Sequence, residues 1–162
     1  MPFTLRAPTP ADVEELAALH ISTWRGTYAH VVPDPHYTPD LLEQRRSLWT
    51  RVTSQAPTNS TWAVAERDGR IIGFAGAGRP LDVDPPAGRQ LYVLYLERGA
   101  HGGGAGQALL DSVLGEGPAF LWVAEDNPRS RAFYRRNGFV PDGARQVDDA
   151  LPDLVEVREV RS

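Results

Sequence analysis

The chain has 162 residues, a length that suits one domain with a full hydrophobic core. Its 21 acidic and 17 basic residues leave a formal net charge of −4, which argues against a nucleic-acid surface, because such surfaces need a basic face. There is no cysteine, which excludes disulfides, a cysteine nucleophile and thiolate metal sites. All 17 basic residues are arginine, so a Schiff-base lysine is excluded as well.

Nothing in the sequence indicates export or membrane insertion. No apolar segment is long enough to cross a bilayer, and no secretory leader is recognisable at the N-terminus. We therefore expect a single domain over residues 1–162 in a cytoplasmic protein, with neither nucleic acid nor membrane as a partner. The sequence leaves homodimer formation open.

The N-terminal part is predicted to form a short strand at Phe3 to Arg6 and then a helix that Thr9 caps, with Pro10 in its first turn. After Trp24 we expect a bend and a polar loop. Trp24 and Tyr28 near this bend, with Tyr37 beyond it, are placed to line a substrate pocket. The alternative is that Trp24 and Tyr28, four residues apart, simply pack together on one helical face.

The middle of the chain is predicted to add a helix and a hairpin. Apolar spacing indicates a helix from Pro39 to Val52. Thr61 to Glu66 and Arg70 to Gly78 alternate as strands around Asp68-Gly69, a strong signal for a tight hairpin turn. Glycines inside the second strand indicate a bulge or a close approach by another group, and they are Gly73, Gly76 and Gly78.

A glycine-rich run links a buried strand to a helix. Leu91 to Leu96 is apolar, β-branched and aromatic, and helical spacing begins at Ala105. Between His101 and Gly106 stand four glycines, which leave the first N–H groups of the helix uncovered for an anion. This pattern predicts a phosphate cradle. The alternative is a loop that only turns the chain.

Two common nucleotide-binding patterns do not fit this run. A Walker loop requires a lysine, and the chain has none. A dinucleotide fingerprint, Gly-x-Gly-x-x-Gly/Ala, places Gln107 or Leu109 where its last small residue should be. Neither spacing therefore accounts for the glycines.

The run His101-Gly102-Gly103-Gly104-Ala105-Gly106 resembles the Gln/Arg-x-x-Gly-x-Gly/Ala pyrophosphate loop of the GNAT superfamily, the acyl-CoA-dependent N-acetyltransferases. His101 replaces the usual glutamine or arginine, which leaves the backbone donors intact. Asn127 to Phe139, read as Asn-x-x-Ser-x-x-Phe-Tyr-x-x-x-Gly-Phe, resembles the second signature of this family. Asn127 and Gly138 also mark the two ends of a short helix there.

This resemblance implies an α/β fold of the α+β type: a central, twisted, mixed and mostly antiparallel sheet of six to seven strands, with helices on both faces. A hairpin of Val140 to Val147 and Leu154 to Val160 would close the sheet. Acetyl-CoA is the implied cosubstrate, with no metal, and it would lie where two strands splay apart. The implied acetyl-CoA-binding residues are Leu94, Tyr95, Leu96, His101, Gly102, Gly103, Gly104, Ala105, Gly106, Asn127 and Ser130.

The implied reaction is direct attack of a primary amine on the thioester, whose carbonyl is polarised by a backbone N–H near Leu94 or Tyr95. The amine belongs to a small molecule, an amino acid or a peptide. Tyr134 is the implied acid for the departing thiolate, and its alternative role is an ordinary core tyrosine.

The general base stays unassigned, because the strand from Leu91 to Leu96 has no carboxylate. A water chain is one option. The candidate side chains are Glu97, His20, His30, His36 and Glu66. Two other functions are compatible with the sequence: a CoA-binding sensor without turnover, and a nucleotide-binding α/β module.

Overall fold

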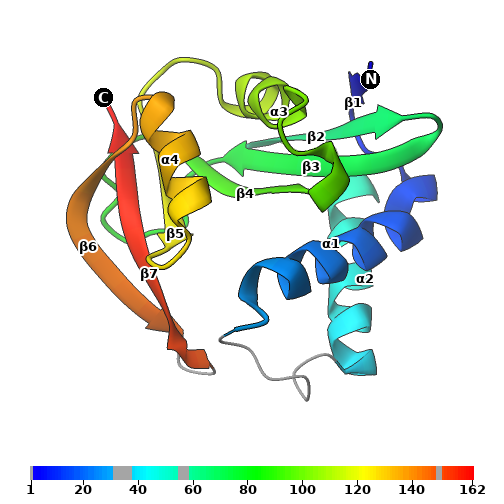
Figure 1. Cartoon of the computed structure of the whole chain (residues 1–162), viewed down its shortest axis with the longest axis horizontal. Helices are drawn as coiled ribbons and strands as arrows, with labels where there is room; N and C mark the ends of the chain where they lie inside the picture. The colour runs from blue at the N-terminus through cyan, green and yellow to red at the C-terminus, as the bar shows by residue number, and fades with distance from the viewer. Residues whose placement is uncertain (1, 31–37, 55–58, 149–150) are drawn as a thin grey trace.

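In the computed structural model, which describes residues 2–30, 38–54, 59–148 and 151–162, the chain is built around one seven-stranded sheet (Figure 1). The strand order is β1-β2-β3-β4-β5-β7-β6, and every neighbouring pair is antiparallel except β4 and β5. This is the expected mixed and mostly antiparallel sheet. The strands are β1 (Thr4–Arg6), β2 (Ser60–Arg67), β3 (Arg70–Gly78), β4 (Gln90–Leu96), β5 (Ala119–Ala124), β6 (Val140–Asp148) and β7 (Leu151–Arg161).

Helices cover both faces of the sheet, as predicted. In β2, Val64 packs with Leu16 and Trp49 from the first two helices, whereas Ala63 and Ala65 face the core formed with the third helix. This alternation follows from the two-residue period of a strand. In the described part of the chain, no helix has the length and apolar character to cross a membrane. The helices are α1 (Val13–Tyr28), α2 (Pro39–Ser54), α3 (Ala105–Leu114) and α4 (Pro128–Arg136).

The hairpin of β2 and β3 confirms the turn prediction. Asp68 and Gly69 have φ values of 53° and 75°, the two positive values that a tight hairpin turn of this kind requires. Within β3, a Cβ added at Gly76 would collide with the ring of Trp62, and β3 is bulged against β4 at this point. Glycine is needed there because another group approaches the backbone closely.

The ends of α4 also lie where the sequence indicates. The side chain of Asn127 accepts a hydrogen bond from the N–H of Ser130 at 3.1 Å, and Gly138 follows the helix with a φ of 86°. The α1 helix differs from the prediction, because it continues through Gly26 to Tyr28 and does not bend after Trp24. Packing of buried Tyr28 against the sheet outweighs the helix-weakening effect of one glycine. The predicted polar loop beyond it, with Tyr37 and His36, lies mostly outside the described residues.

The β4 and β5 strands diverge in the middle of the sheet. Their register pairs only Gln90 with Phe120 and Leu91 with Leu121, although β4 continues to Leu96. In Figure 1 the β1–β4 part of the sheet and the β5-β7-β6 part separate beyond this short contact. The splay that the sequence predicted is therefore present, and it exposes one backbone edge of β4.

Candidate active site

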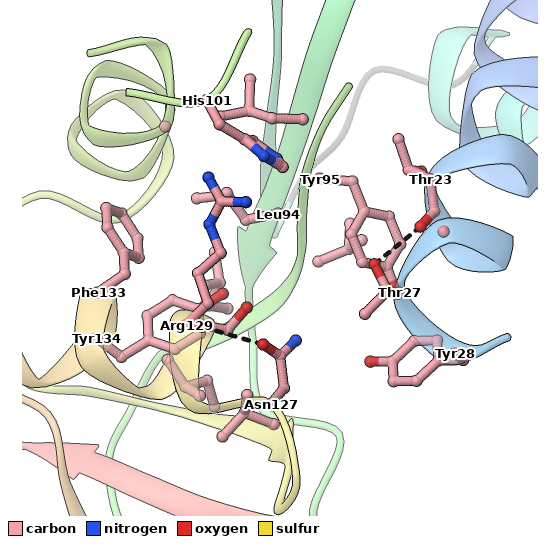
Figure 2. Close-up of a pocket in the computed structure, with 18 of the residues that line it drawn as sticks. Thr23, Thr27, Tyr28, Leu94, Tyr95, His101, Asn127, Arg129, Phe133 and Tyr134 are labelled. Atoms are coloured by element: carbon pink, nitrogen blue, oxygen red, sulfur yellow. Dashed lines mark hydrogen bonds between the residues drawn. The ribbon is translucent and has the colours of Figure 1, made fainter. Parts of the chain in front are cut away.

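A cavity of about 820 Å³ lies at the splay between β4 and β5, within the size range of small-molecule and cofactor sites (Figure 2). Its walls come from β4, β5, the glycine loop, α4 and one face of α1, with one residue from β7. Two segments that are far apart in the sequence, the glycine loop and α4, thus share one space. The sequence-predicted residues that line it are Tyr28, Leu94, Tyr95, Leu96, His101, Gly102, Gly104, Gly106, Asn127, Ser130 and Tyr134.

Three predicted residues are not part of the cavity lining. Ala105, the first residue of α3, is buried in the core with 2% of its surface exposed, and Gly103 is exposed on the loop. Trp24 packs its ring against that of Tyr28, with the ring centroids 5.7 Å apart. The packing alternative for this aromatic pair is therefore present, and Tyr28 nevertheless lines the cavity.

The glycine loop has the backbone geometry of an anion cradle. Gly102 and Gly104 have φ values of 80° and 85°, and a Cβ added at either would project into open space. A Cβ at Gly106 would come within 3.1 Å of the Leu96 side chain, so this glycine lets α3 approach β4. Gly104 is the N-cap of α3 and carries no side chain over the free N–H groups of the first turn. These features fit a phosphate group.

Arginines add positive charge to this wall of the cavity. Arg98, Arg129 and Arg136 line it, and none of the three has an ion-pair partner in the described part of the chain. Figure 2 shows the Arg129 side chain extending towards His101. Burial and, secondarily, the positive charge of Arg129 lower the pKa of His101, which keeps its imidazole neutral at pH 7. Sequence reasoning missed these arginines, although Arg98 lies just before the glycine run and the other two lie within the second signature segment.

Three tyrosines meet in the cavity, each from a different element. Burial raises the pKa values of Tyr28, Tyr95 and Tyr134, so their hydroxyls stay protonated at neutral pH. The Tyr134 ring packs at 5.3 Å from Phe133 and 5.9 Å from Phe139, measured between ring centroids. Tyr134 is thus both a core residue and a lining residue, and its role as an acid stays a prediction.

The α1 wall presents hydroxyl oxygens that sequence reasoning also missed. The Thr23 hydroxyl donates to the Leu19 carbonyl at 2.7 Å. The Thr27 hydroxyl donates to the Thr23 carbonyl at 2.8 Å, as Figure 2 shows. Ser22 donates to Leu19 in the same way at 3.1 Å. Because each proton is used inside the helix, the oxygen remains as a hydrogen-bond acceptor for a ligand.

The lining also contains three carboxylates. Asp126 lies 2.6 Å from Nε2 of His30, and Glu97 lies 3.5 Å from Arg67. Glu97, one of the candidate bases, thus lies in the cavity wall with this ion pair. The third, Glu156 on β7, was missed, because nothing in the local sequence sets it apart from its neighbours on the strand.

The other candidate bases lie elsewhere or have other partners. His20 is buried outside the lining, with its ring centroid 5.1 Å from that of Phe74. Burial lowers its pKa to about 3, so it is neutral at pH 7. Glu66 pairs with Arg6 at 2.8 Å, also outside the lining. His36 lies outside the described residues.

The fold and the cavity define an acyltransferase of the GNAT type, and comparison with known proteins shows the family directly. The model of the acetyltransferase (GNAT) family matches residues 15–139, so the chain belongs to this family, whose members use acetyl-CoA. The match includes α1, both signature segments and the strands between them.

Curated relatives of the chain are named as N-acetyltransferases. Mycobacterium tuberculosis "Probable N-acetyltransferase Rv2775" is 31% identical over 145 residues, which is 86% of this chain and 80% of the relative. "Uncharacterized N-acetyltransferase Rv2669" of the same species is 39% identical over 140 residues, 83% of this chain and 86% of the relative. The chain is therefore an acyltransferase by its family and its relatives.

Solved structures share the fold. The PaiA N-acetyltransferase of Thermoplasma acidophilum, solved in complex with coenzyme A, superposes with a TM-score of 0.74 at 20% identity and covers 100% of this chain and 99% of that one. A ribosomal-protein-alanine N-acetyltransferase of Brucella melitensis gives a TM-score of 0.72 at 24% identity, with 98% of each chain covered. At these identities the similarity is one of fold.

Proposed function

We propose that this protein transfers the acetyl group of acetyl-CoA directly to a primary amine of a small molecule, an amino acid or a peptide. The observation that carries the proposal is the glycine cradle of Gly102 and Gly104, which lines the same cavity at the β4/β5 splay as Tyr134. One cavity thus combines an anion site, an exposed strand edge and a buried hydroxyl. These are the parts that transfer from a phosphate-bearing thioester requires.

The donor half of the site follows from the physics of the cradle and the strand edge. The pyrophosphate would accept hydrogen bonds from the backbone N–H groups of residues 102–106, which include Gly103 and Ala105 although their side-chain positions lie outside the lining. Arg98, Arg129 and Arg136 would neutralise phosphate charge. The pantetheine amides would pair with the open edge of β4 at Leu94 to Leu96, in the manner of an added strand. Asn127 and Ser130, joined by the capping hydrogen bond, would close the site beside it.

The chemistry needs a polarised carbonyl, a neutral amine and a proton for the leaving sulfur. A backbone N–H near Leu94 or Tyr95 would polarise the thioester carbonyl by donating a hydrogen bond to its oxygen, where negative charge develops. The N–C bond then forms while the C–S bond breaks, and Tyr134 protonates the departing thiolate. Because burial raises the pKa of Tyr134, its hydroxyl stays protonated throughout the neutral range. No covalent enzyme intermediate is involved.

The acceptor would lie on the α1 side of the cavity. Tyr28 contributes to this wall, and Trp24 supports it from behind through ring packing. The hydroxyl oxygens of Thr23 and Thr27 add hydrogen-bond acceptors that suit an amine donor. The size and the open polar character of the wall favour a small or extended amine.

The test is a panel of primary amines assayed for CoA thiol release in the presence of acetyl-CoA. We expect at least one alkylamine, amino acid or peptide to release CoA above the rate of hydrolysis, with a matching acetylated product by mass spectrometry. Binding of acetyl-CoA without release by any amine would favour the CoA sensor. Binding of NAD with an affinity equal to that of acetyl-CoA would favour a general nucleotide-binding module.

A further inference from the structure

Glu156 stands out among the three carboxylates in the cavity because its partner is neutral. Asp126 pairs with His30 and Glu97 pairs with Arg67. Glu156 accepts a hydrogen bond at Oε2 from the side-chain amide of Gln146 at 2.7 Å. In the described part of the chain, its other oxygen, Oε1, has no hydrogen-bond or ion-pair partner. This carboxylate therefore has one oxygen left to bind a ligand, and no basic side chain of the described residues pairs with it.

The sheet register places the Glu156 side chain on the acceptor side of the cavity. Glu156 lies directly opposite Ala124 in the antiparallel β5/β7 pair, and directly opposite residues project from the same face. Ala124 and Leu154, the latter two residues before Glu156 on β7, pack against Tyr28 of α1. Since alternate residues share a face, Glu156 points to the same side as Tyr28.

The lining side chains that carry a charge but have no ion-pair partner among the described residues lie on two different walls of the cavity. Arginines lie with the glycine loop and α4, and Glu156 lies with the hydroxyl oxygens of α1. Burial, and then the negative charges of Glu156 and Asp126, raise the pKa of Tyr28, and all three residues line the cavity. On the cavity side, the titratable groups near Glu156 are Tyr28 from α1, and Asp126 with its partner His30. Arg158 lies two residues further along β7 on the same face, and its guanidinium pairs with Asp82 and Asp142. A cationic amine is the ligand that complements this wall.

Resting on the proposed acetyl transfer, we propose that Glu156 binds the acceptor as its ammonium ion and removes the proton that blocks attack. The ammonium loses two protons overall. Glu156 takes the first, which frees the nitrogen lone pair to form the N–C bond, and later releases it to solvent. The second leaves the nitrogen as the C–S bond breaks, and it restores the proton that Tyr134 gives to the CoA sulfur. The products are the amide, CoA thiol and one proton.

The substitution Glu156→Gln tests this role, because it keeps the shape and the Gln146 side of the interaction but cannot accept the proton. With an alkylamine whose ammonium titrates near pH ~10, parental kcat/KM should be nearly level between pH 7 and 9. The variant should lose about 10²–10⁴-fold at pH 7 and recover about tenfold for each pH unit, because only the amine already neutral in solution can react. Its affinity for acetyl-CoA should stay within about threefold of the parent.

Two further variants separate the effect of losing the carboxylate from a general effect of substitution. Glu156→Asp retains a carboxylate, so its pH profile should stay level even if its rate is lower. Glu125→Gln is the matched control, because Glu125 lies outside the lining and pairs at 2.8 Å with exposed Arg145. It should keep the parental profile.

A Glu156→Gln variant with parental kcat/KM at pH 7 would overturn the inference. So would a loss that is equal at every pH, a pH-dependent loss in Glu156→Asp, or a tenfold fall in acetyl-CoA affinity. If the parent itself releases no CoA with any amine, the proposed function fails and takes this inference with it. If the parent is active and the Glu156→Gln loss is independent of pH, this inference alone fails.

Discussion

Replacing Gly104 with valine should remove acetyl-CoA binding while leaving the protein folded. Gly104 has a φ of 85°, a left-handed conformation that costs a non-glycine residue about 1–3 kcal/mol. For a chain of 162 residues, each kcal/mol of lost stability lowers the melting temperature by about 2–4 °C. The variant should stay folded, because the free energy of unfolding of a typical domain is about 5–15 kcal/mol. The penalty for binding should be larger, because the valine side chain projects into the open space of the cradle.

The loss of affinity can be estimated from the donors that the valine would cover. A hydrogen bond from a backbone N–H to a charged group contributes about 1.5–3 kcal/mol. Obstructing two such donors at the start of α3 therefore lowers affinity by at least about 100-fold, since about 1.4 kcal/mol corresponds to a factor of ten. Isothermal titration calorimetry with acetyl-CoA measures this, and circular dichroism confirms the fold.

Gly69→Val is the matched control for this experiment. Gly69 also has a positive φ, 75°, and a Cβ added there would likewise meet open space, but it lies in the β2/β3 turn outside the cavity. It should lose a similar amount of stability and bind acetyl-CoA as the parent does. If Gly104→Val is folded and keeps parental affinity, or if both variants lose affinity equally, the loop is not a phosphate cradle.

The remaining predictions concern one reaction step and two buried groups. Tyr134→Phe should lower kcat by about 10²–10⁴-fold, while the affinity for acetyl-CoA stays within a few-fold of the parent. If the variant keeps the parental kcat at several pH values, water protonates the CoA thiolate instead. Asp12, whose pKa Arg6 lowers from 3.8 to about 2, contributes stability above pH ~4 that is lost as the pH falls towards 2. Asp12→Asn should therefore lower the free energy of unfolding by about 1–2 kcal/mol at pH 7, a range that allows for solvent screening at the partly exposed Arg6. Urea unfolding measures the difference between parent and variant. A difference that is as large at pH 2 as at pH 7 would contradict the prediction. Burial lowers the pKa of His20 from 6.5 to about 3. As the pH falls, His20 therefore takes up its proton in the unfolded chain before it does so in the folded chain. The free energy of unfolding then decreases by up to about 1.4 kcal/mol per pH unit below 6.5. His20→Phe should flatten this slope between pH 6 and 4, and an unchanged slope would show that other groups cause it.

Local signals carried most of the fold prediction. Asp68-Gly69 predicted the β2/β3 turn, and Asn127 and Gly138 predicted both ends of α4, because caps and positive-φ positions depend on a few adjacent residues. The glycine spacing likewise predicted the loop at 101–106. The extension of α1 through Gly26 could not be predicted this way, because it depends on where Tyr28 packs against distant strands.

The candidate site was predictable on one side only. The wall of the glycine loop and α4 is formed by two contiguous motifs that resemble the signatures of the family, so its lining residues could be predicted from that resemblance. The acceptor wall depends on strand register: Glu156 reaches the cavity because β7 pairs with β5 and places it opposite Ala124. No periodic pattern in β7 distinguishes that glutamate from Glu159, which is buried on the other face against Arg131.

Thermal unfolding with acetyl-CoA tests the central claim most directly, because every step of the account requires acetyl-CoA to bind the folded cavity. At about 100 times its dissociation constant, a ligand that binds only the folded state adds about 2.7 kcal/mol, or about 5–11 °C in melting temperature for a chain of this size. We expect a shift of this order with acetyl-CoA and none with NAD at the same concentration. No shift with acetyl-CoA, or an equal shift with NAD, would contradict the assignment.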